Sequence, residues 1–308
     1  MWFFWLIVIL LVLALVLCLF MYFYIFYNSP KAHQFPEDLH NNEKLRPYYS
    51  KMKPLVDDLM NSPCEQVYIK SRDGLKLTGY YYENAPGAPV DLMMHGYKAC
   101  RAFDFCGTFQ ISKHLGHNVL MIDERACGKS EGVTVTFGIK ERRDCLDWIN
   151  FILKRNGPDT PIYLFGVSMG AATVMMATDL SLPSNVKAII ADCGYTSPKD
   201  IIIKVAADTG FPAVNLLYPF ARIGASLFGR FDLEESSAVE AVMHTDIPIL
   251  IIHGYVDSFV PYYMSGEIYA AVASEKQLLT VENAEHAKSY ITAPELYEKN
   301  VADFIAAH

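Results

Sequence analysis

The sequence predicts an α/β fold in which a mostly parallel sheet carries helices on both faces and follows an antiparallel hairpin. Short runs of β-branched and large apolar residues alternate with amphipathic stretches from residue 90 onward. These runs are apolar at nearly every position, as in parallel strands buried on both faces. The connections between them are long enough for crossover helices, so helices are expected to cover the sheet.

The first 27 residues all belong to the set Ala, Val, Ile, Leu, Met, Phe, Trp, Tyr and Cys. They would form about 40 Å of helix, against a hydrocarbon core of about 30 Å. The stretch is longer than a signal-peptide core, no basic residue precedes it, and no small-x-small cleavage site precedes Asn28. We expect residues 1–27 to form a single-pass anchor in the lipid bilayer. A buried core helix is the alternative, although such a helix usually has a polar face.

The charge balance and the cysteines exclude several other classes of protein. The chain has 26 basic and 34 acidic residues, a net charge of −8, and no cluster of basic residues, so nucleic-acid binding is not expected. Its seven cysteines show no CxxC and no zinc-ligand spacing, which predicts reduced structural thiols and no metal site. Three basic residues, Lys31, Lys44 and Arg46, follow the span and favour a cytoplasmic domain, but neighbouring acidic residues weaken this bias.

We divide the chain into an anchor (1–28), a juxtamembrane spacer (29–62) with a short helix near 48–60, and a globular domain (63–308). In the domain, Arg72-Asp73-Gly74 is a turn sequence between two strand-like runs. The predicted strands are Gln66–Lys70, Leu75–Tyr82, Val90–Met94, Val119–Ile122, Ile162–Phe165, Val186–Ala191, Ile249–Ile252 and Gln277–Val281.

Two amphipathic helices are predicted most clearly. The first covers Gly138 to Arg155 and should bury Ile139, Leu146, Ile149 and Leu153 on one face. The second begins at Pro294 with Thr292 as its cap and continues to the C-terminus. Its inward face is expected to contain Tyr297, Val301, Phe304 and Ile305.

A candidate nucleophile lies directly after a predicted strand. Gly166-Val167-Ser168-Met169-Gly170 follows Ile162–Phe165 and precedes a helical run of small residues. A sharp strand-to-helix turn strains the serine backbone, and glycines on both sides remove the Cβ atoms that would collide. Ser168 Oγ would then project at a helix N-terminus, whose dipole favours a developing anion.

A serine hydroxyl needs a base and a group that orients the base. Asp257 follows the strand Ile249–Ile252, and His286 follows the strand Gln277–Val281. The chain order is therefore Ser168, Asp257, His286, with a carboxylate and an imidazole each placed in a loop after a strand. This order is that of a Ser-Asp-His catalytic triad.

With these segments in place, the chain from Cys64 to His308 resembles the α/β-hydrolase superfamily, in particular its bacterial esterase and serine-aminopeptidase-like branch. Besides the segments around Ser168, Asp257 and His286, the likeness rests on Met94-His95-Gly96-Tyr97 and on Asp123 to Gly132. The resemblance implies that Ser168 is the nucleophile, that His286 is general base and then acid, and that Asp257 holds the imidazole.

The resemblance further implies that the backbone N–H groups of Tyr97 and Met169 form the oxyanion hole. We expect the reaction to need no metal and no cofactor. Ala126 stands where the commoner family form has glycine, and Arg125 beside it is expected to form an ion pair, with recognition of a substrate carboxylate as the alternative.

Several residues compete for these roles. Asp192 ends an earlier strand and is the alternative acid to Asp257, because some hydrolases place the acid there. His95 and His253 precede glycines at strand ends and are expected to order loops rather than to act as bases. Cys127 and Cys193 are expected to be inert thiols, with redox sensitivity as the alternative if they are exposed.

An insertion of about 35 residues, 198–232, separates the strand that ends near Asp192 from the strand at Ile249. Residues 211–221 of this insertion carry no charge. We interpret the insertion as a helical cap that makes an apolar pocket over Ser168, with ordinary packing of its helices on the sheet as the alternative.

The sequence thus predicts a membrane-anchored, lipase-like serine esterase that cleaves carboxylic esters with apolar acyl or aryl groups through an acyl-enzyme. A thioesterase and an aminopeptidase-like amidase would use the same triad. A binding protein on a non-catalytic hydrolase fold is the alternative from another class.

Overall fold

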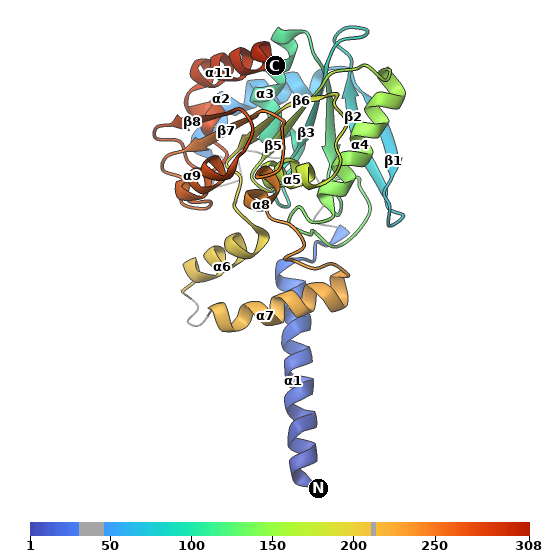
Figure 1. The fold of residues 1–308 in the computed structure, drawn as a ribbon, viewed down its shortest axis with the longest axis vertical. Coiled ribbons are helices and arrows are strands. Elements are labelled where there is room, and N and C mark those ends of the chain that lie inside the picture. The colour runs from blue at the N-terminus through green and yellow to red at the C-terminus, as the bar shows by residue number, and fades with distance from the viewer. Residues whose placement is uncertain (31–45, 211–213) are drawn as a thin grey trace.

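An eight-stranded sheet forms the centre of the computed structural model, which describes residues 1–30, 46–210 and 214–308 (Figure 1). The strands lie in the order β1-β2-β4-β3-β5-β6-β7-β8. β1 pairs antiparallel with β2 and β2 antiparallel with β4, while all other pairs are parallel. The strands are β1 (Glu65–Lys70), β2 (Lys76–Tyr82), β3 (Val90–Met94), β4 (Asn118–Asp123), β5 (Ile162–Val167), β6 (Val186–Asp192), β7 (Ile249–Gly254) and β8 (Lys276–Val281). The predicted fold class and each predicted strand are confirmed, with ends that differ by one or two residues.

Helices cover both faces of the sheet. One face carries α2 (Tyr49–Asn61), α3 (Arg101–Leu115), α10 (Ser289–Thr292) and α11 (Pro294–Ala307). The other face carries α4 (Glu141–Asn156), α5 (Met169–Met176), α8 (Ala238–Val242) and α9 (Tyr262–Ala271). Alternation along a strand divides the core in the same way: Leu92 and Met94 of β3 face one layer and Met93 the other. Short 3-10 turns precede α2 (Arg46–Tyr48) and follow α5 (Ala177–Asp179).

The structure corrects two details of the predicted helices. The buried apolar positions of α4 are Cys145, Trp148, Ile149 and Ile152, whereas Leu146 and Leu153 are only half-buried. The predicted face was displaced because the large Trp148 and the small Cys145, not the leucines, fit against the sheet.

The N-cap of α11 is Ala293, not Thr292, because Thr292 is the last residue of the preceding helix α10. The four residues predicted to face inward from α11, Tyr297, Val301, Phe304 and Ile305, are all buried.

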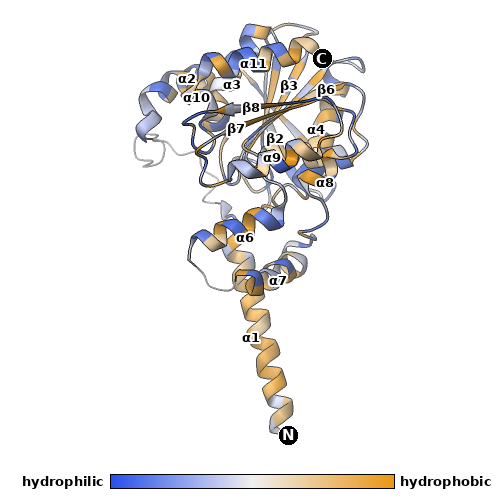
Figure 2. Cartoon of the chain, turned by 60° about the vertical axis from the view of Figure 1, so that its left-hand side comes forward, coloured by the Kyte–Doolittle hydropathy of each residue, from blue (hydrophilic) through white to orange (hydrophobic). Residues whose placement is uncertain are grey.

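The N-terminal helix α1 (Trp2–Ile25) projects from the body as a stem, and Figure 2 colours it orange along nearly its whole length. Within the described part of the chain it is the one helix long and apolar enough to cross a membrane. It is compatible with a single-pass anchor, and a signal sequence near the N-terminus would pass the same test of length and hydropathy. Lys31 and Lys44, on which the expected orientation depends, lie outside the described residues.

The inserted segment between β6 and β7 lies outside the two helical layers. It contains α6 (Pro198–Asp208), α7 (Val214–Gly224) and one π-helical turn, Ala225–Gly229. α6 and α7 lie between the sheet and the stem, and α7 lies across α1 (Figure 1). We call residues 198–210 and 214–232 the cap; residues 211–213 of the predicted insertion lie outside the described residues.

The chain that follows α1 packs into the core of the globular body. Phe26 is fully buried, and its ring lies 5.8 Å from that of Phe137 and 5.4 Å from that of Phe231. The backbone N–H of Asn28 donates to Val133 O, and that of Val135 donates to Phe26 O, both at 2.9 Å. The end of the stem is thus fixed rigidly to the body.

Candidate active site

Ser168 occupies a strained turn between β5 and α5. Its φ of +56° and ψ of −114° lie in a region that side chains rarely adopt. The neighbouring glycines explain why the turn is possible: a Cβ at Gly166 would lie 2.3 Å from Gly170 O, and a Cβ at Gly170 would lie 1.8 Å from Met94 O. The turn therefore requires glycine at both positions and fixes Ser168 at the carboxyl edge of the sheet.

The structure brings Ser168, His286 and Asp257 into one hydrogen-bonded row. His286 Nε2 lies 2.9 Å from Ser168 Oγ, and His286 Nδ1 lies 2.7 Å from Asp257 Oδ2. An ionised carboxylate only accepts, so the Nδ1 proton is donated to Asp257 and Nε2 is left to accept from the serine hydroxyl. The three residues come from the loops after β8, β7 and β5, which are far apart in sequence and adjacent at one sheet edge.

Asp257 is held in place by several donors besides His286. Its Oδ1 accepts from the backbone N–H groups of Phe259 and Val260, both at 2.9 Å. The buried His253 lies 3.3 Å from Oδ2 and also contacts Val260 O and Ser265 Oγ. Burial opposes the charge, but the hydrogen bonds from His253 and His286 outweigh it and hold the pKa of Asp257 below its ordinary value.

Asp192, the alternative acid, is placed differently. Its Oδ1 accepts from Ser289 Oγ at 3.1 Å, and burial raises its pKa to about 6. The carboxylate that contacts His286 is therefore that of Asp257. His95 likewise orders a loop, because its Nε2 accepts the backbone N–H of Glu124 at 3.1 Å.

The two backbone groups predicted to form an oxyanion hole flank Ser168. Met169 is the first residue of α5, a position whose N–H has no acceptor within the helix. The loop that contains Tyr97 touches the serine, since a Cβ built on Gly96 would lie 3.4 Å from Ser168 Cβ. This loop is held by Asp104, which accepts the N–H of Gly96 at 2.7 Å. Asp104 was not predicted, because a lone aspartate in the first turn of α3 has no motif around it.

A second contact that the sequence did not predict joins this loop to the stem. Tyr97 Oη donates to the carbonyl of Ile25, the last residue of α1, at 2.5 Å, and Lys98 Nζ donates to Tyr27 O at 2.8 Å. The ring of Tyr97 lies 4.9 Å from that of Phe137, which in turn packs on Phe26. The edge of the sheet that carries Ser168 therefore faces the end of the N-terminal helix.

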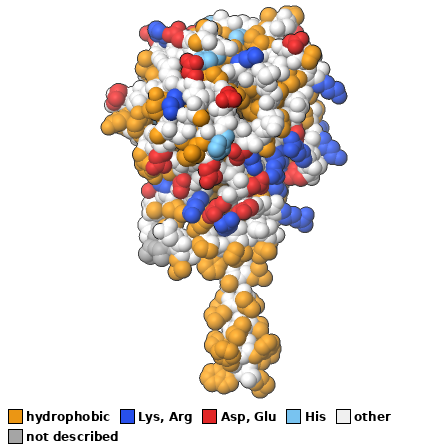
Figure 3. All heavy atoms as spheres, in the orientation of Figure 1, with side chains coloured by type: hydrophobic (Ala, Val, Ile, Leu, Met, Phe, Trp, Pro, Cys, Tyr) orange, Lys and Arg blue, Asp and Glu red, His pale blue; other side chains and the backbone are white. Residues whose placement is uncertain are grey.

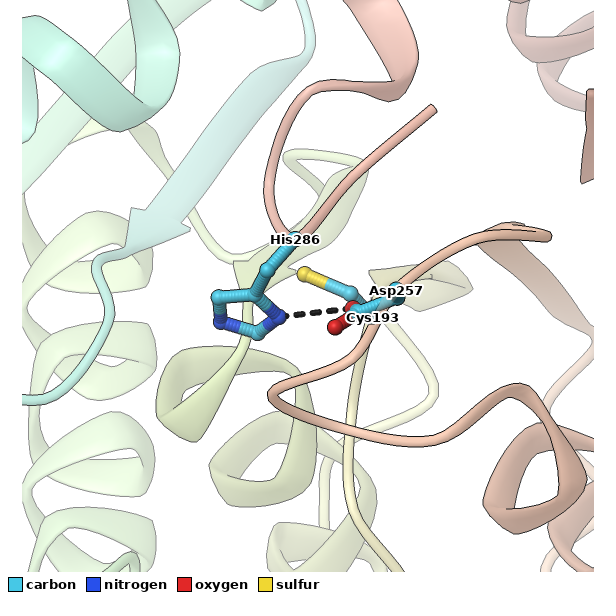
Figure 4. Close-up of side chains that lie close together, drawn as sticks. All are labelled: Cys193, Asp257 and His286. Atoms are coloured by element: carbon cyan, nitrogen blue, oxygen red, sulfur yellow. Dashed lines mark hydrogen bonds and ion pairs between the residues drawn. The ribbon is translucent and has the colours of Figure 1, made fainter. Parts of the chain in front are cut away.

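Cys193 lies beside the row of hydrogen bonds (Figure 4). Its Sγ, a carboxylate oxygen of Asp257 and a ring nitrogen of His286 are all within 4.8 Å of one another, a spacing that a metal ion requires. Both nitrogens of His286 already have partners, however, and burial raises the pKa of the Cys193 thiol, which disfavours the thiolate that binds metal. The arrangement fits a hydrogen-bonded triad better than a metal site.

An apolar side chain lies at the rim of the site. The ring of Phe259 lies 4.9 Å from that of His286 and is 40% exposed. Tyr255 and Val256, which precede Asp257 in the chain, and Tyr263 of α9 are also exposed. Large exposed apolar groups beside a polar triad are typical of a site that binds an apolar ligand.

Arg125 is engaged in ion pairs, as expected. It donates to both oxygens of Asp144 at 2.7 Å and to Asp73 at 2.9 and 3.3 Å. Only about a twentieth of its side chain is exposed. The guanidinium thus fixes the loop after β4 to the β1–β2 hairpin.

Comparisons with known proteins agree with this fold. Residues 92–214 match the family described as alpha/beta hydrolase fold. The uncharacterized protein YqkD of Bacillus subtilis is 26% identical over 238 residues, or 77% of each chain. The lysophosphatidylserine lipase ABHD12 of Danio rerio is 26% identical over 261 residues, covering 75% of this chain and 64% of that protein.

Solved structures share the architecture at lower sequence identity. The esterase Pf2001 of Pyrococcus furiosus superimposes with a TM-score of 0.66 at 20% identity, over 82% of this chain and 92% of that one. The ferulic acid complex of Est1E from Butyrivibrio proteoclasticus has a TM-score of 0.60 at 22% identity, over 78% and 98% of the two chains. The family match over residues 92–214 and the curated relatives support a hydrolase of the α/β-hydrolase type, and the solved structures show the same fold.

Proposed function

We propose that the chain is a membrane-anchored serine hydrolase that cleaves carboxylic esters with an apolar acyl or aryl group. The observation that carries this proposal is the unbroken row from Ser168 through His286 to Asp257, with distances of 2.9 and 2.7 Å. Such a row activates a hydroxyl that is otherwise a weak nucleophile.

The reaction proceeds in two steps. His286 Nε2 takes the proton of Ser168 as Oγ attacks the ester carbonyl, and the N–H groups of Met169 and Tyr97 stabilise the oxyanion. The imidazolium, stabilised by Asp257, then protonates the leaving alcohol, and an acyl-serine remains. Water, deprotonated by His286, attacks this ester, and the imidazolium returns the proton to Ser168 Oγ as the acid leaves.

Two observations support an apolar ester that resides in lipid. The ring of Phe259, which lies beside His286, is exposed at the rim of the site. The edge of the sheet bearing the site also faces α1, which we assign as the anchor. The name of the Danio rerio relative, a lysophosphatidylserine lipase, points to the same class of substrate.

The proposal is tested with the full chain in detergent or nanodiscs. A fluorophosphonate probe should label the wild type and fail to label Ser168→Ala, because the nucleophile is then absent. Ser168→Ala should also lose at least about 10³-fold in kcat while its unfolding temperature is retained. Retained turnover in that variant would refute the assignment.

A panel of p-nitrophenyl esters from acetate to dodecanoate defines the acyl group, and matched thioesters and aminoacyl amides test the other two leaving groups. Preference for the longer acyl chains is expected. A sharp preference for acetate with rejection of long chains would exclude the lipid-like substrate and leave the triad assignment intact.

A further inference from the structure

Helix α7 of the cap exposes an apolar face that no described residue covers. Leu216 is 70% exposed, Ile223 two turns later is 47% exposed, and Leu227 one turn further is 55% exposed. The polar side of α7 is instead held to the chain that follows it. Arg222 forms ion pairs with Asp232 at 3.0 Å and with Glu234 at 2.7 Å. The helix is thus amphipathic, with its charged side fixed and its apolar side free.

α7 and α1 are in direct contact where they cross, around Gly224 and Cys18. A Cβ built on Gly224 would lie 2.4 Å from the carbonyl oxygen of Cys18, so glycine lets the two backbones approach closely. Around this crossing the ring of Tyr22 lies 5.8 Å from that of Phe228, and its hydroxyl is 2.6 Å from Thr134 Oγ1. α7 lies across α1 rather than along it (Figure 1).

The level of the crossing along α1 matches the edge of a bilayer. Cys18 is the first buried residue of the chain. The uncovered part of the helix before it is about 25 Å long, close to the roughly 30 Å of a hydrocarbon core. In the space-filling view, apolar side chains gather on the underside of the body around the stem, and charged ones lie above them (Figure 3).

We propose that the apolar face of α7 and the following turn, formed by Leu216, Ile223 and Leu227, lies in the surface of the lipid bilayer as an in-plane membrane-binding helix. This proposal rests on the membrane anchoring stated above. A lipid surface is the occupant because the face is continuous with α1 and lies where α1 leaves the hydrocarbon. The burial of three large apolar side chains adds to the anchoring by α1 and fixes the tilt of the body on the membrane.

This placement has a consequence for the site. The carbonyl end of α1 contacts Tyr97, so the catalytic edge of the sheet is held toward the bilayer. A cleft of about 490 Å³ in the cap is lined by Ile203, Tyr218 and Pro219 together with the polar Lys199, Asn215, Arg222 and Glu234. Because Lys199 and Arg222 both pair with Glu234, the cleft offers apolar walls and a neutralised polar side.

Depth-dependent fluorescence quenching tests the proposal on the full chain in phosphatidylcholine vesicles. Cys64 is exposed and is replaced by serine, whereas burial raises the pKa of Cys100 to about 12 and keeps it unreactive. The remaining cysteines are buried: Cys18, Cys106, Cys127, Cys145 and Cys193. An environment-sensitive fluorophore is then attached to Leu216→Cys and, in a second variant, to Leu227→Cys.

Two controls bracket the measurement. Leu296→Cys places the label on α11, at the opposite end of the body, where the native leucine is 45% exposed. Leu13→Cys places it in the middle of α1, where the native leucine is 59% exposed. Vesicle binding should shift the emission at 216 and 227 to the blue, because the labels enter an apolar environment. Lipids that carry a nitroxide near the headgroup should quench most of this emission and leave the label at 296 unquenched. A nitroxide deep in the acyl chain should quench 13 most.

The outcomes separate this proposal from those it rests on. If the labels at 216 and 227 behave like that at 296 while 13 is quenched, α7 does not bind the membrane and the proposal is overturned, although the anchor stands. If 13 is also unquenched, the anchoring itself fails, and the proposal fails with it. Labelling of Ser168 by fluorophosphonate in the same samples reports the hydrolase activity independently of either result.

Discussion

The turn at Ser168 and the crossing of α7 with α1 both depend on glycine at a close backbone contact, yet they differ in how they are held. Gly170, in the first turn of α5, lies against Met94 O at the end of the central strand β3. Gly224 lies against Cys18 O between two helices at the edge of the body. The first contact fixes the turn of the proposed nucleophile, and the second fixes the body relative to the proposed anchor. The comparison teaches that a chemical site requires rigid local geometry, whereas an attachment to lipid tolerates displacement.

The largest expected effect sharpens the chemical side of this comparison. Asp257→Asn should lower kcat by about 10⁴-fold, because an amide no longer holds His286 in the tautomer that accepts the serine proton. The matched control is Asp192→Asn, which removes a buried carboxylate at the same sheet edge that bonds Ser289 instead of His286. Steady-state kinetics with one ester measure both. Equal losses in the two variants would show that the acid is not Asp257 alone.

The next effect contrasts the two glycines directly. Gly170→Ala should destabilise the chain by about 3 kcal/mol or more, because its Cβ would lie 1.8 Å from Met94 O and neither strand nor helix can move. Gly224→Ala should leave the unfolding temperature nearly unchanged, because α7 can separate from α1. Thermal unfolding measures the first, and faster hydrogen exchange in α7 reports the second. The comparison breaks if Gly224→Ala unfolds the body.

Asp192 supplies a pH-dependent effect of intermediate size. Its pKa is raised from 3.8 to about 6 in the folded chain, so folding is opposed in full above pH 6, by about 3 kcal/mol, and the penalty disappears as the pH falls below 3.8. Asp192→Asn should therefore raise the unfolding temperature at pH 8 and give no advantage at pH 3.5. Thermal unfolding of the two proteins at both pH values checks the sign. A gain that is independent of pH would rule out the buried charge as its cause.

The smallest effect concerns the link between the two regions. Tyr97→Phe removes the hydrogen bond to Ile25 O at the end of α1. A lost bond of about 1 kcal/mol in the transition state corresponds to roughly a fivefold lower kcat. KM should be unchanged, because the loop acts on the oxyanion and not on the bound ester.

Tyr195→Phe is the control for this variant. It removes a hydroxyl that donates to Phe137 O at 3.0 Å and does not touch the stem. A change in unfolding temperature without a change in kcat for Tyr97→Phe would show that the link to the stem is only structural.

Much of the fold and of the site was predictable because it follows from local rules. Strands buried on both faces are apolar at nearly every position, so the positions of β3, β4, β5 and β7 could be predicted from short apolar runs. The turn at Ser168 needs glycine on both sides, which makes it visible as a pattern. Loops after parallel strands meet at one edge, so Asp257 and His286 could be assigned to the same place.

Other features left no pattern to read. Asp104, the acceptor for Gly96, is a single aspartate in a helix. The buried residues of α4, Cys145, Trp148, Ile149 and Ile152, have helical spacing, but the packing of Trp148 on the sheet decided which of two overlapping faces points inward. The choice between Asp192 and Asp257 was open in the sequence, because both follow parallel strands, and it was decided by which carboxylate reaches His286.

The sequence by itself determined the α/β fold, the apolar N-terminal segment and the placement of Ser168 and His286 in loops after strands, because periodicity, turn sterics and chain order are local properties. Only the tertiary structure decided that Phe26 enters the core, that Tyr97 bonds to the end of α1, and that Gly224 lets α7 cross it. These are contacts between segments 72 to more than 200 residues apart. Their physical basis is the fit of side chains across space, which no spacing along the chain records.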